Sequence, residues 1–154
     1  MNTKERVRCV HGNLYAYARH KQTIDDFVAR AMRQNGKQWD SAGSRGTFRS
    51  DPAARGGMLL ADPPPRIKSA IDWCCAIEDA WAECRMLDEG NDRGTAYLLE
   101  AYFCLGGKER SRDKNRESRA AICAECGISE STFYAWLGRI TEIVCYHAAR
   151  RGLV

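Results

Sequence analysis

The amino-acid sequence predicts an all-α protein, a small helical bundle that is interrupted by one long irregular arm. Apolar side chains recur at three- and four-residue steps before residue 34 and after residue 66, which is the spacing of one helix face. Residues 35–65 lack this periodicity and are rich in Gly, Ser, Pro and Arg. We therefore expect a basic helical segment (1–34), a linker or arm (35–65) and a helical domain (66–154).

Composition places the chain among ordinary globular proteins of the cell interior. Its 154 residues, 44% of them hydrophobic and 29% charged, suffice for one core. We expect no membrane span, because no apolar run approaches the ~18 residues that a span needs. The charged start MNTKERVRCV does not look like a secretory signal. The eight cysteines are then expected to be reduced thiols.

Charge is spread unevenly along the sequence. The net charge of +4 divides into +6 for residues 1–66, −5 for residues 67–105 and +3 for residues 106–154. A basic C-terminal region suits a polyanionic partner such as nucleic acid. The acidic middle does not, and we expect it to face solvent or a protein partner.

Residues 3–34 are expected to form one helix or two, with Thr23 as a possible cap between two apolar stripes. In the arm, scattered Arg and single aromatic residues would allow contacts with nucleic acid or protein, but a plain linker is the preferred interpretation. Pro63-Pro64-Pro65 suits the start of the next helix. That helix should cover residues 66–89, with Trp73 and Trp81 in the core and a stripe made of Ile67, Ala70, Ile71, Cys74, Ile77, Trp81, Cys84 and Leu87.

Residues 119–144 carry the most specific pattern, which predicts a helix-turn-helix. Gly127 stands where a tight turn between helices needs a left-handed backbone, and Ser129 is placed to cap the second helix. Apolar residues repeat at helical spacing on both sides of the turn. They are Ile122, Cys123 and Cys126 before it, and Ile128, Phe133, Leu137, Ile140 and Val144 after it. A further helix over residues 94–105 should pack against this motif through Leu98, Leu99, Tyr102 and Phe103.

If Phe133, Leu137 and Ile140 point inward, the opposite edge of the second helix is free to enter a DNA major groove. Ser131 and Tyr134 can hydrogen-bond bases or phosphates, and Arg139 suits a phosphate or a guanine. Glu130 is compatible with a cytosine amino group and is otherwise unfavourable beside DNA. The predicted DNA-binding residues are Ser129, Glu130, Ser131, Thr132, Tyr134, Ala135 and Arg139. The alternative is that this face binds protein.

A basic strip precedes the motif, and residues 107–118 are either a flexible loop or an extension of its first helix. Contacts from this strip to phosphates would raise affinity and steepen its salt dependence. Its candidate residues are Lys108, Arg110, Arg112, Lys114, Arg116 and Arg119. The other interpretation is a solvated segment of alternating charge.

Chemistry at a metal or catalytic centre is not expected. Cys123-x-x-Cys126 has the spacing of half a zinc site, but no second pair of ligands accompanies it, and both thiols occupy positions that want small apolar residues. The three histidines have no nucleophile partner, and Gly106-Gly107-Lys108 lacks the remainder of a phosphate loop. We therefore expect a binding protein without cofactors rather than an enzyme.

The run Ile122-Cys123-Ala124-Glu125-Cys126-Gly127-Ile128-Ser129 resembles the helix-turn-helix of sigma-factor region 4, with Cys at its Ala and Leu positions. The stretch YLLEAYF at residues 97–103 is similar to the helix that precedes that motif. This layout also resembles bacteriophage late-gene antitermination proteins of the Q type and related late transcription regulators. In region 4 the two parts lie within a few residues, whereas here residues 107–118 intervene.

The resemblance implies a cytoplasmic protein of an infected bacterium. It would bind double-stranded DNA near a late promoter, join RNA polymerase with its sigma factor, and give read-through of terminators. It further implies that the acidic middle and the arm engage polymerase and that the arm could lie along nascent RNA. Two alternatives remain open: an activator or repressor that does not travel with polymerase, and a protein–protein adaptor that uses a helix-turn-helix fold.

Overall fold

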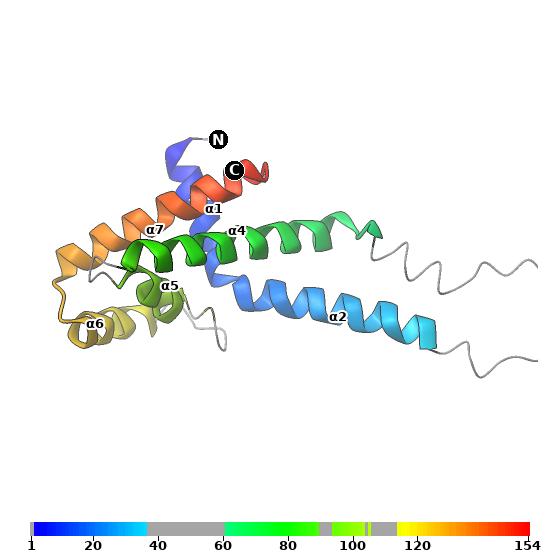
Figure 1. The fold of residues 1–154 in the computed structure, drawn as a ribbon, viewed down its shortest axis with the longest axis horizontal. Coiled ribbons are helices and arrows are strands. Elements are labelled where there is room, and N and C mark those ends of the chain that lie inside the picture. The colour runs from blue at the N-terminus through cyan, green and yellow to red at the C-terminus, as the bar shows by residue number, and fades with distance from the viewer. Residues whose placement is uncertain (1, 37–60, 90–93, 104, 106–113) are drawn as a thin grey trace, which may run out of the picture.

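The computed structural model describes residues 2–36, 61–89, 94–103, 105 and 114–154, with the side chains of residues 34–36 and 114–118 left undescribed. Within these ranges the chain is all-helical, which confirms the expected fold class. The helices are α1 (Thr3–Tyr15), α2 (Tyr17–Gly36), α4 (Pro65–Asp88), α5 (Thr95–Phe103), α6 (Lys114–Cys126) and α7 (Glu130–Arg150) (Figure 1). Most of the predicted arm, residues 37–60, lies outside the described part.

The N-terminal segment forms two helices that change direction at Ala16. Asn2 caps α1 by accepting a hydrogen bond from the backbone N–H of Glu5, whose carboxylate accepts one from the N–H of Asn2 in return. The expected cap at Thr23 is wrong. Thr23 lies inside α2, where its hydroxyl donates to the carbonyl of Arg19 (2.8 Å), a local bond that a threonine within a helix makes without ending it.

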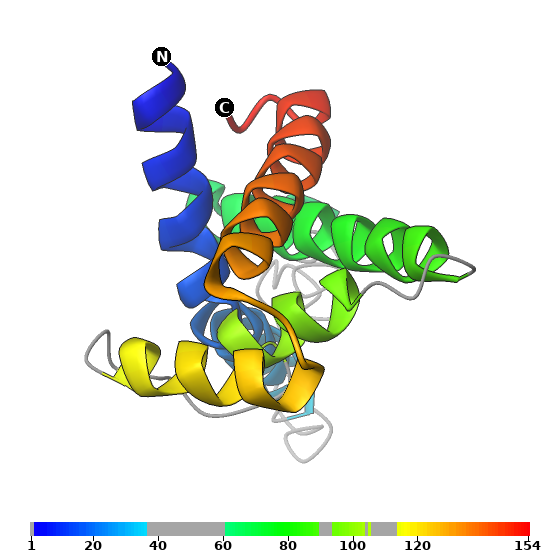
Figure 2. The same cartoon turned by 90° about the vertical axis from the view of Figure 1, so that its left-hand side faces the viewer.

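The helices are arranged around α4 and α7, which cross each other. α2 lies along α4, while α1 lies along α7 (Figures 1 and 2). α5 packs against α4, α6 and α7, and α6 forms the end of the molecule where α7 begins. The break at Ala16 therefore lets the first two helices cover different partners.

One core is shared by α1, α4, α5 and α7, together with Tyr17 of α2 and Ile122 of α6. Its largest fully buried side chains are Leu14, Ile77, Leu98, Leu99, Phe133, Ile140, Val10, Val144 and Cys84. The Tyr102 and Phe133 rings meet edge to face with their centroids 5.3 Å apart, so α5 packs on the second motif helix as predicted.

The long helix α4 begins at Pro65, close to the predicted start, because proline fits the first helical turn. Most of its predicted stripe is buried, together with Trp73. Trp81 is half-buried beneath the guanidinium of Arg85, 4.5 Å from its ring centroid. Leu87, which the stripe placed in the core, is exposed at the end of the helix.

Several acidic side chains of the middle region have partners within the chain. Glu83 pairs with His147 (2.8 Å) and Asp79 pairs with Arg151 (2.7 Å), which fixes α4 to the C-terminal part of α7. Asp88 accepts hydrogen bonds from the Thr95 hydroxyl (2.6 Å) and the backbone N–H of Ala96 (2.8 Å) at the start of α5. Part of the region expected to form an acidic surface thus binds other helices of the same chain.

Glu78 joins α4 to α2. Its Oε1 accepts hydrogen bonds from the Tyr17 hydroxyl (2.7 Å) and from Lys21 Nζ (2.9 Å). The bond from Lys21 and then that from Tyr17 lower the pKa of Glu78, whereas burial and the bond to Glu78 raise the pKa of Tyr17 to about 12. The lowered pKa of Glu78 favours its charged carboxylate, and the raised pKa of Tyr17 favours the neutral phenol that donates to it.

We expect Glu78→Gln to lower the free energy of unfolding by up to about 1 kcal/mol at pH 7, a small effect because this pair is partly solvated. Because the pKa of Glu78 is lower in the folded protein than its ordinary value of 4.5, the charged carboxylate stabilises the fold. This stabilisation is fully present at a pH above 4.5 and is lost as the pH falls through the pKa that Glu78 has in the folded protein. Urea denaturation at pH 7 and near pH 3 should therefore show a deficit that shrinks with acid. Glu100→Gln, at an exposed position of α5, is the control; a deficit independent of pH would contradict the assignment.

Candidate nucleic-acid interface

The turn between α6 and α7 has the geometry that its sequence predicts. Gly127 has a φ of 62°, in the left-handed region. The backbone N–H of Ile128 donates to the carbonyl of Cys123 (3.0 Å), and that of Gly127 donates to Ala124 (3.4 Å). This pair of bonds is the Schellman arrangement, which satisfies carbonyls that α6 would otherwise leave free.

Ser129 begins the second helix as predicted. Its backbone is extended and its Oγ accepts a hydrogen bond from the N–H of Thr132 (3.2 Å). The hydroxyls of Ser131 (2.8 Å) and Thr132 (3.0 Å) also lie within hydrogen-bond distance of this oxygen. The three hydroxyls thus form a small polar cluster at the start of α7, in which Ser129 acts first as a helix cap.

The inward face of the motif is buried where the sequence predicts it. Phe133, Ile140 and Val144 are fully covered, and Ile122 is nearly so. Cys123, Cys126, Ile128 and Leu137 are half-buried against this core. Burial raises the pKa of the Cys126 thiol, so its neutral form is favoured. No cluster of metal-binding side chains occurs among the described residues.

The opposite face of α7 presents most of the predicted DNA-binding residues to solvent. We call this face the outward edge; it comprises Ser129, Glu130, Ser131, Tyr134, Ala135 and Arg139, all exposed. Thr132, also predicted to contact DNA, is half-buried and lies beside the cap instead. Because the inward residues are fixed in the core, the direction of the outward edge is fixed as well.

Arg119 does not stand free as a member of the basic strip. From α6 it reaches across to α7, where Nη2 lies 3.0 Å from Glu130 Oε1 and Nη1 donates to the hydroxyl of Tyr134 (2.5 Å). Its guanidinium carbon is 5.7 Å from the centroid of the Tyr134 ring, and its side chain is 24% exposed. Arg119 therefore binds two residues of the outward edge.

The remaining strip residues are placed only in part. Lys114 and Arg116 belong to α6, which begins at Lys114, so the first motif helix extends further towards the N-terminus than residue 119. Their side chains are not described. Lys108, Arg110 and Arg112 lie outside the described residues. The alternative of an extended first helix is thus correct for residues 114–118.

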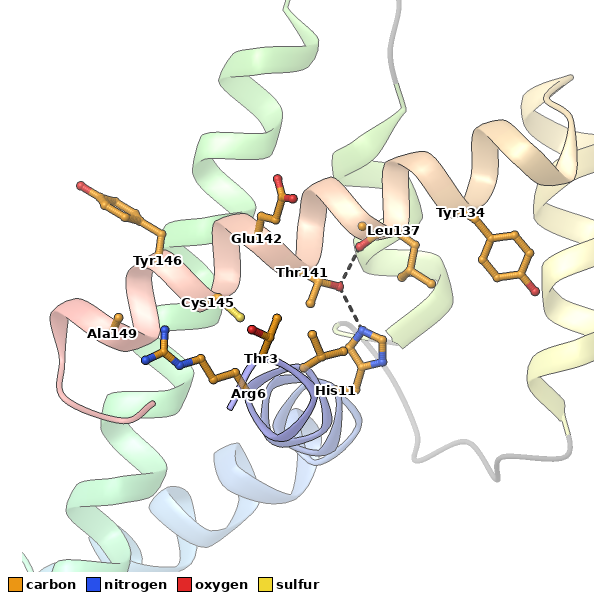
Figure 3. Close-up of a pocket in the computed structure, with 12 residues that line it drawn as sticks. Thr3, Arg6, His11, Tyr134, Leu137, Thr141, Glu142, Cys145, Tyr146 and Ala149 are labelled. Carbon is orange, nitrogen blue, oxygen red and sulfur yellow. Dashed lines mark hydrogen bonds between the residues drawn. The ribbon is translucent and has the colours of Figure 1, made fainter. Parts of the chain in front are cut away.

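A groove of about 670 Å³ runs between α1 and α7 (Figure 3). Its α7 wall extends from Tyr134 to Ala149, and its α1 wall includes Thr3, Arg6 and His11. The Thr141 hydroxyl donates to the carbonyl of Leu137 (2.7 Å), so it accepts from His11 Nε2 (3.0 Å). Burial lowers the pKa of His11, in agreement with a neutral ring that donates through Nε2.

Sequence reasoning missed the part that α1 plays here. His11 and Thr141 are 130 positions apart, and nothing in either local pattern indicates that they meet. It also missed the bond from the Tyr97 hydroxyl of α5 to Glu125 of α6 (2.6 Å), which raises the pKa of Tyr97 to about 12. These contacts hold both motif helices in place from outside the motif.

We expect Gly127→Ala to lower the free energy of unfolding by about 1 kcal/mol, because alanine is strained at positive φ even though its Cβ would meet nothing within 4 Å. Gly12→Ala is the matched control: it lies within α1, where an added Cβ also meets no atom, and should stabilise the protein by up to about 1 kcal/mol. Denaturant titration of both variants tests this. Equal effects of the same sign would contradict the geometry assigned to the turn.

None of the helices in the described part is both long and apolar enough to cross a membrane. Comparison of the chain with protein-family models, with curated proteins and with solved structures finds no significant match.

Proposed function

We propose that this chain is a DNA-binding transcription regulator that reads duplex DNA with the outward edge of α7. The observation that carries the proposal is the combination of a capped, tightly turned helix pair with an exposed polar edge at the start of its second helix. In helix-turn-helix proteins, residues at this place contact base edges in the major groove. The edge offers hydroxyl groups and Arg139, which are side chains suited to that contact.

Charge supports the same interpretation. Glu130 is the acidic residue of the outward edge, and its carboxylate is paired with Arg119 at 3.0 Å. Its repulsion of DNA phosphates is therefore reduced. The C-terminal region 106–154 carries a net charge of +3, which favours a polyanion.

The resemblance to late-gene antitermination proteins supports a sharper proposal. The protein would bind DNA near a late promoter, join RNA polymerase and make it resistant to terminators. A regulator that acts only on initiation is the second candidate. A protein–protein adaptor is the third, because the same exposed edge would also accommodate a protein surface.

DNA reading can be tested with two matched double variants on one helix. Binding sites are first selected with the wild-type protein from a random duplex library. Tyr134→Ala with Arg139→Ala should then weaken binding to the selected site at least tenfold, because base contacts by such residues contribute about 1–3 kcal/mol each. The footprint should disappear at the same protein concentration.

The control is Tyr146→Ala with Arg150→Ala, which removes the same residue types from the far end of α7, where Arg150 lies over the Tyr146 ring. Both double variants remove one positive charge, so a non-specific effect of charge would be equal in the two. The affinity of the control for the selected site should remain within about twofold of the wild type, because Tyr146 and Arg150 lie outside the outward edge. Equal losses in the two double variants, or no loss in the first, would favour the adaptor.

Antitermination can be separated from control of initiation by in-vitro transcription. The template carries the selected site near a promoter and an intrinsic terminator downstream, and the control template carries a scrambled site. We expect the protein to increase the read-through fraction only when the site is present. A change in transcript number with unchanged read-through would support a regulator of initiation instead.

A further inference from the structure

We propose that Arg119 is a positioning residue, which holds Tyr134 so that its hydroxyl hydrogen is directed to an acceptor on DNA. The inference rests on the proposed function and deepens it. It assigns Arg119 a role different from the phosphate contact that its basic neighbours suggest. It also assigns Tyr134 a definite chemical preference, namely for a hydrogen-bond acceptor.

The geometry joins three side chains from two helices. The guanidinium of Arg119 lies against the ring of Tyr134 and donates through Nη1 to its hydroxyl. Through Nη2 the same group contacts the carboxylate of Glu130, one helical turn before Tyr134. The guanidinium is planar and rigid, and it is held by contacts with both residues. It therefore restricts the position of the Tyr134 hydroxyl, which would otherwise vary by rotation about the side-chain bonds of Tyr134.

The preference of Tyr134 for an acceptor follows from the hydrogen-bond donors that Arg119 and Tyr134 carry. A guanidinium has donors only, so the Tyr134 oxygen must act as the acceptor in this pair. The single hydroxyl hydrogen of Tyr134 is then left for another partner. Tyr134 is 50% exposed, and Figure 3 shows its hydroxyl pointing away from α1 and towards α6. This free hydrogen needs an acceptor, which a partner on DNA can supply.

Acceptors of this kind in the major groove are purine N7, guanine O6 and thymine O4. A phosphate oxygen is also an acceptor. The amino group of cytosine is a donor and does not fit. If Tyr134 contacts a base rather than a phosphate, that base is expected not to be cytosine.

Arg119 itself is poorly placed to contact a phosphate. Its side chain is 24% exposed, and both of its Nη atoms already bind outward-edge residues. Its pairing with Glu130 also offsets a negative charge that would otherwise face the DNA backbone. Arg119 should therefore affect affinity through Tyr134 and Glu130 rather than through counterion release.

The test is a double-mutant cycle made in a Glu130→Gln background, so that loss of Arg119 does not leave an unpaired carboxylate. Arg119→Gln, Tyr134→Phe and their combination are compared on the selected site at several salt concentrations. Tyr134→Phe keeps the ring and removes only the hydroxyl, which makes it the variant of least structural risk. Thermal unfolding checks that each variant is folded.

We expect each single change to weaken binding about five- to tenfold, as for loss of one hydrogen bond, and the combination to weaken it no further. Compared with Arg119→Gln, Arg119→Lys should restore part of the affinity when Tyr134 is present. It should restore none in combination with Tyr134→Phe. The slope of affinity against salt should be unchanged by Arg119→Gln. An arginine that contacts a phosphate would reduce this slope by about 0.9.

Modified DNA identifies the acceptor. Replacing a purine by its 7-deaza form removes N7, and a methylphosphonate linkage removes a phosphate oxygen charge. Substitution at the contacted position should weaken binding by the wild type but not by the Tyr134→Phe variant. An effect of the 7-deaza form identifies purine N7, and an effect of the methylphosphonate identifies a phosphate oxygen. If neither form has an effect while Tyr134→Phe still weakens binding, the acceptor is guanine O6 or thymine O4.

Four results would overturn the inference while leaving DNA binding intact. They are additive losses in the cycle, a reduced salt slope for Arg119→Gln, a Tyr134→Phe variant that binds as the wild type does, and selection of cytosine at the Tyr134-dependent position. If the wild type enriches no sequence from the library, the proposed function itself fails, and the inference fails with it. The two kinds of failure are thus distinguished by the first step.

Discussion

The two faces of α7 constrain almost everything else in this molecule. Phe133, Ile140 and Val144 on one face are completely buried, while Tyr134 and Arg139 on another are exposed. A helix has a rigid relation between its faces, so burial of the first face determines where the second one points. The start of α7 can therefore present polar groups in a defined direction.

The rest of the fold fixes α7 along its length by polar contacts that only distant segments can supply. Thr141 is joined to His11 of α1, His147 to Glu83 of α4, and Arg151, just beyond the helix, to Asp79. Near the turn, Tyr97 of α5 holds α6 through Glu125. The outward edge is thus supported by helices that do not belong to the motif, a condition for precise contact with a ligand.

More charged side chains have partners within this protein than the distribution of charge along the sequence indicates. The sequence predicts that the acidic middle faces solvent or a protein partner, but Glu78, Asp79, Glu83 and Asp88 all bind groups of the same chain. Arg119 looked like part of a basic strip, but it binds Glu130 and Tyr134. Net charge of a segment describes its average field, whereas the role of one charged residue depends on what lies within about 4 Å of it.

Features that depend on near neighbours along the chain can be predicted from the amino-acid sequence. The helical class, the start of α4 at the prolines, the left-handed Gly127 and the cap at Ser129 follow from spacing and from backbone preferences that act within a few residues. The division of the N-terminal helices at Ala16 rather than at Thr23 became clear only from the folded structure. The same is true of the contacts between His11 and Thr141 and between Arg119 and Tyr134. Those contacts join residues of different helices, and their free energy depends on a packing that no local pattern encodes.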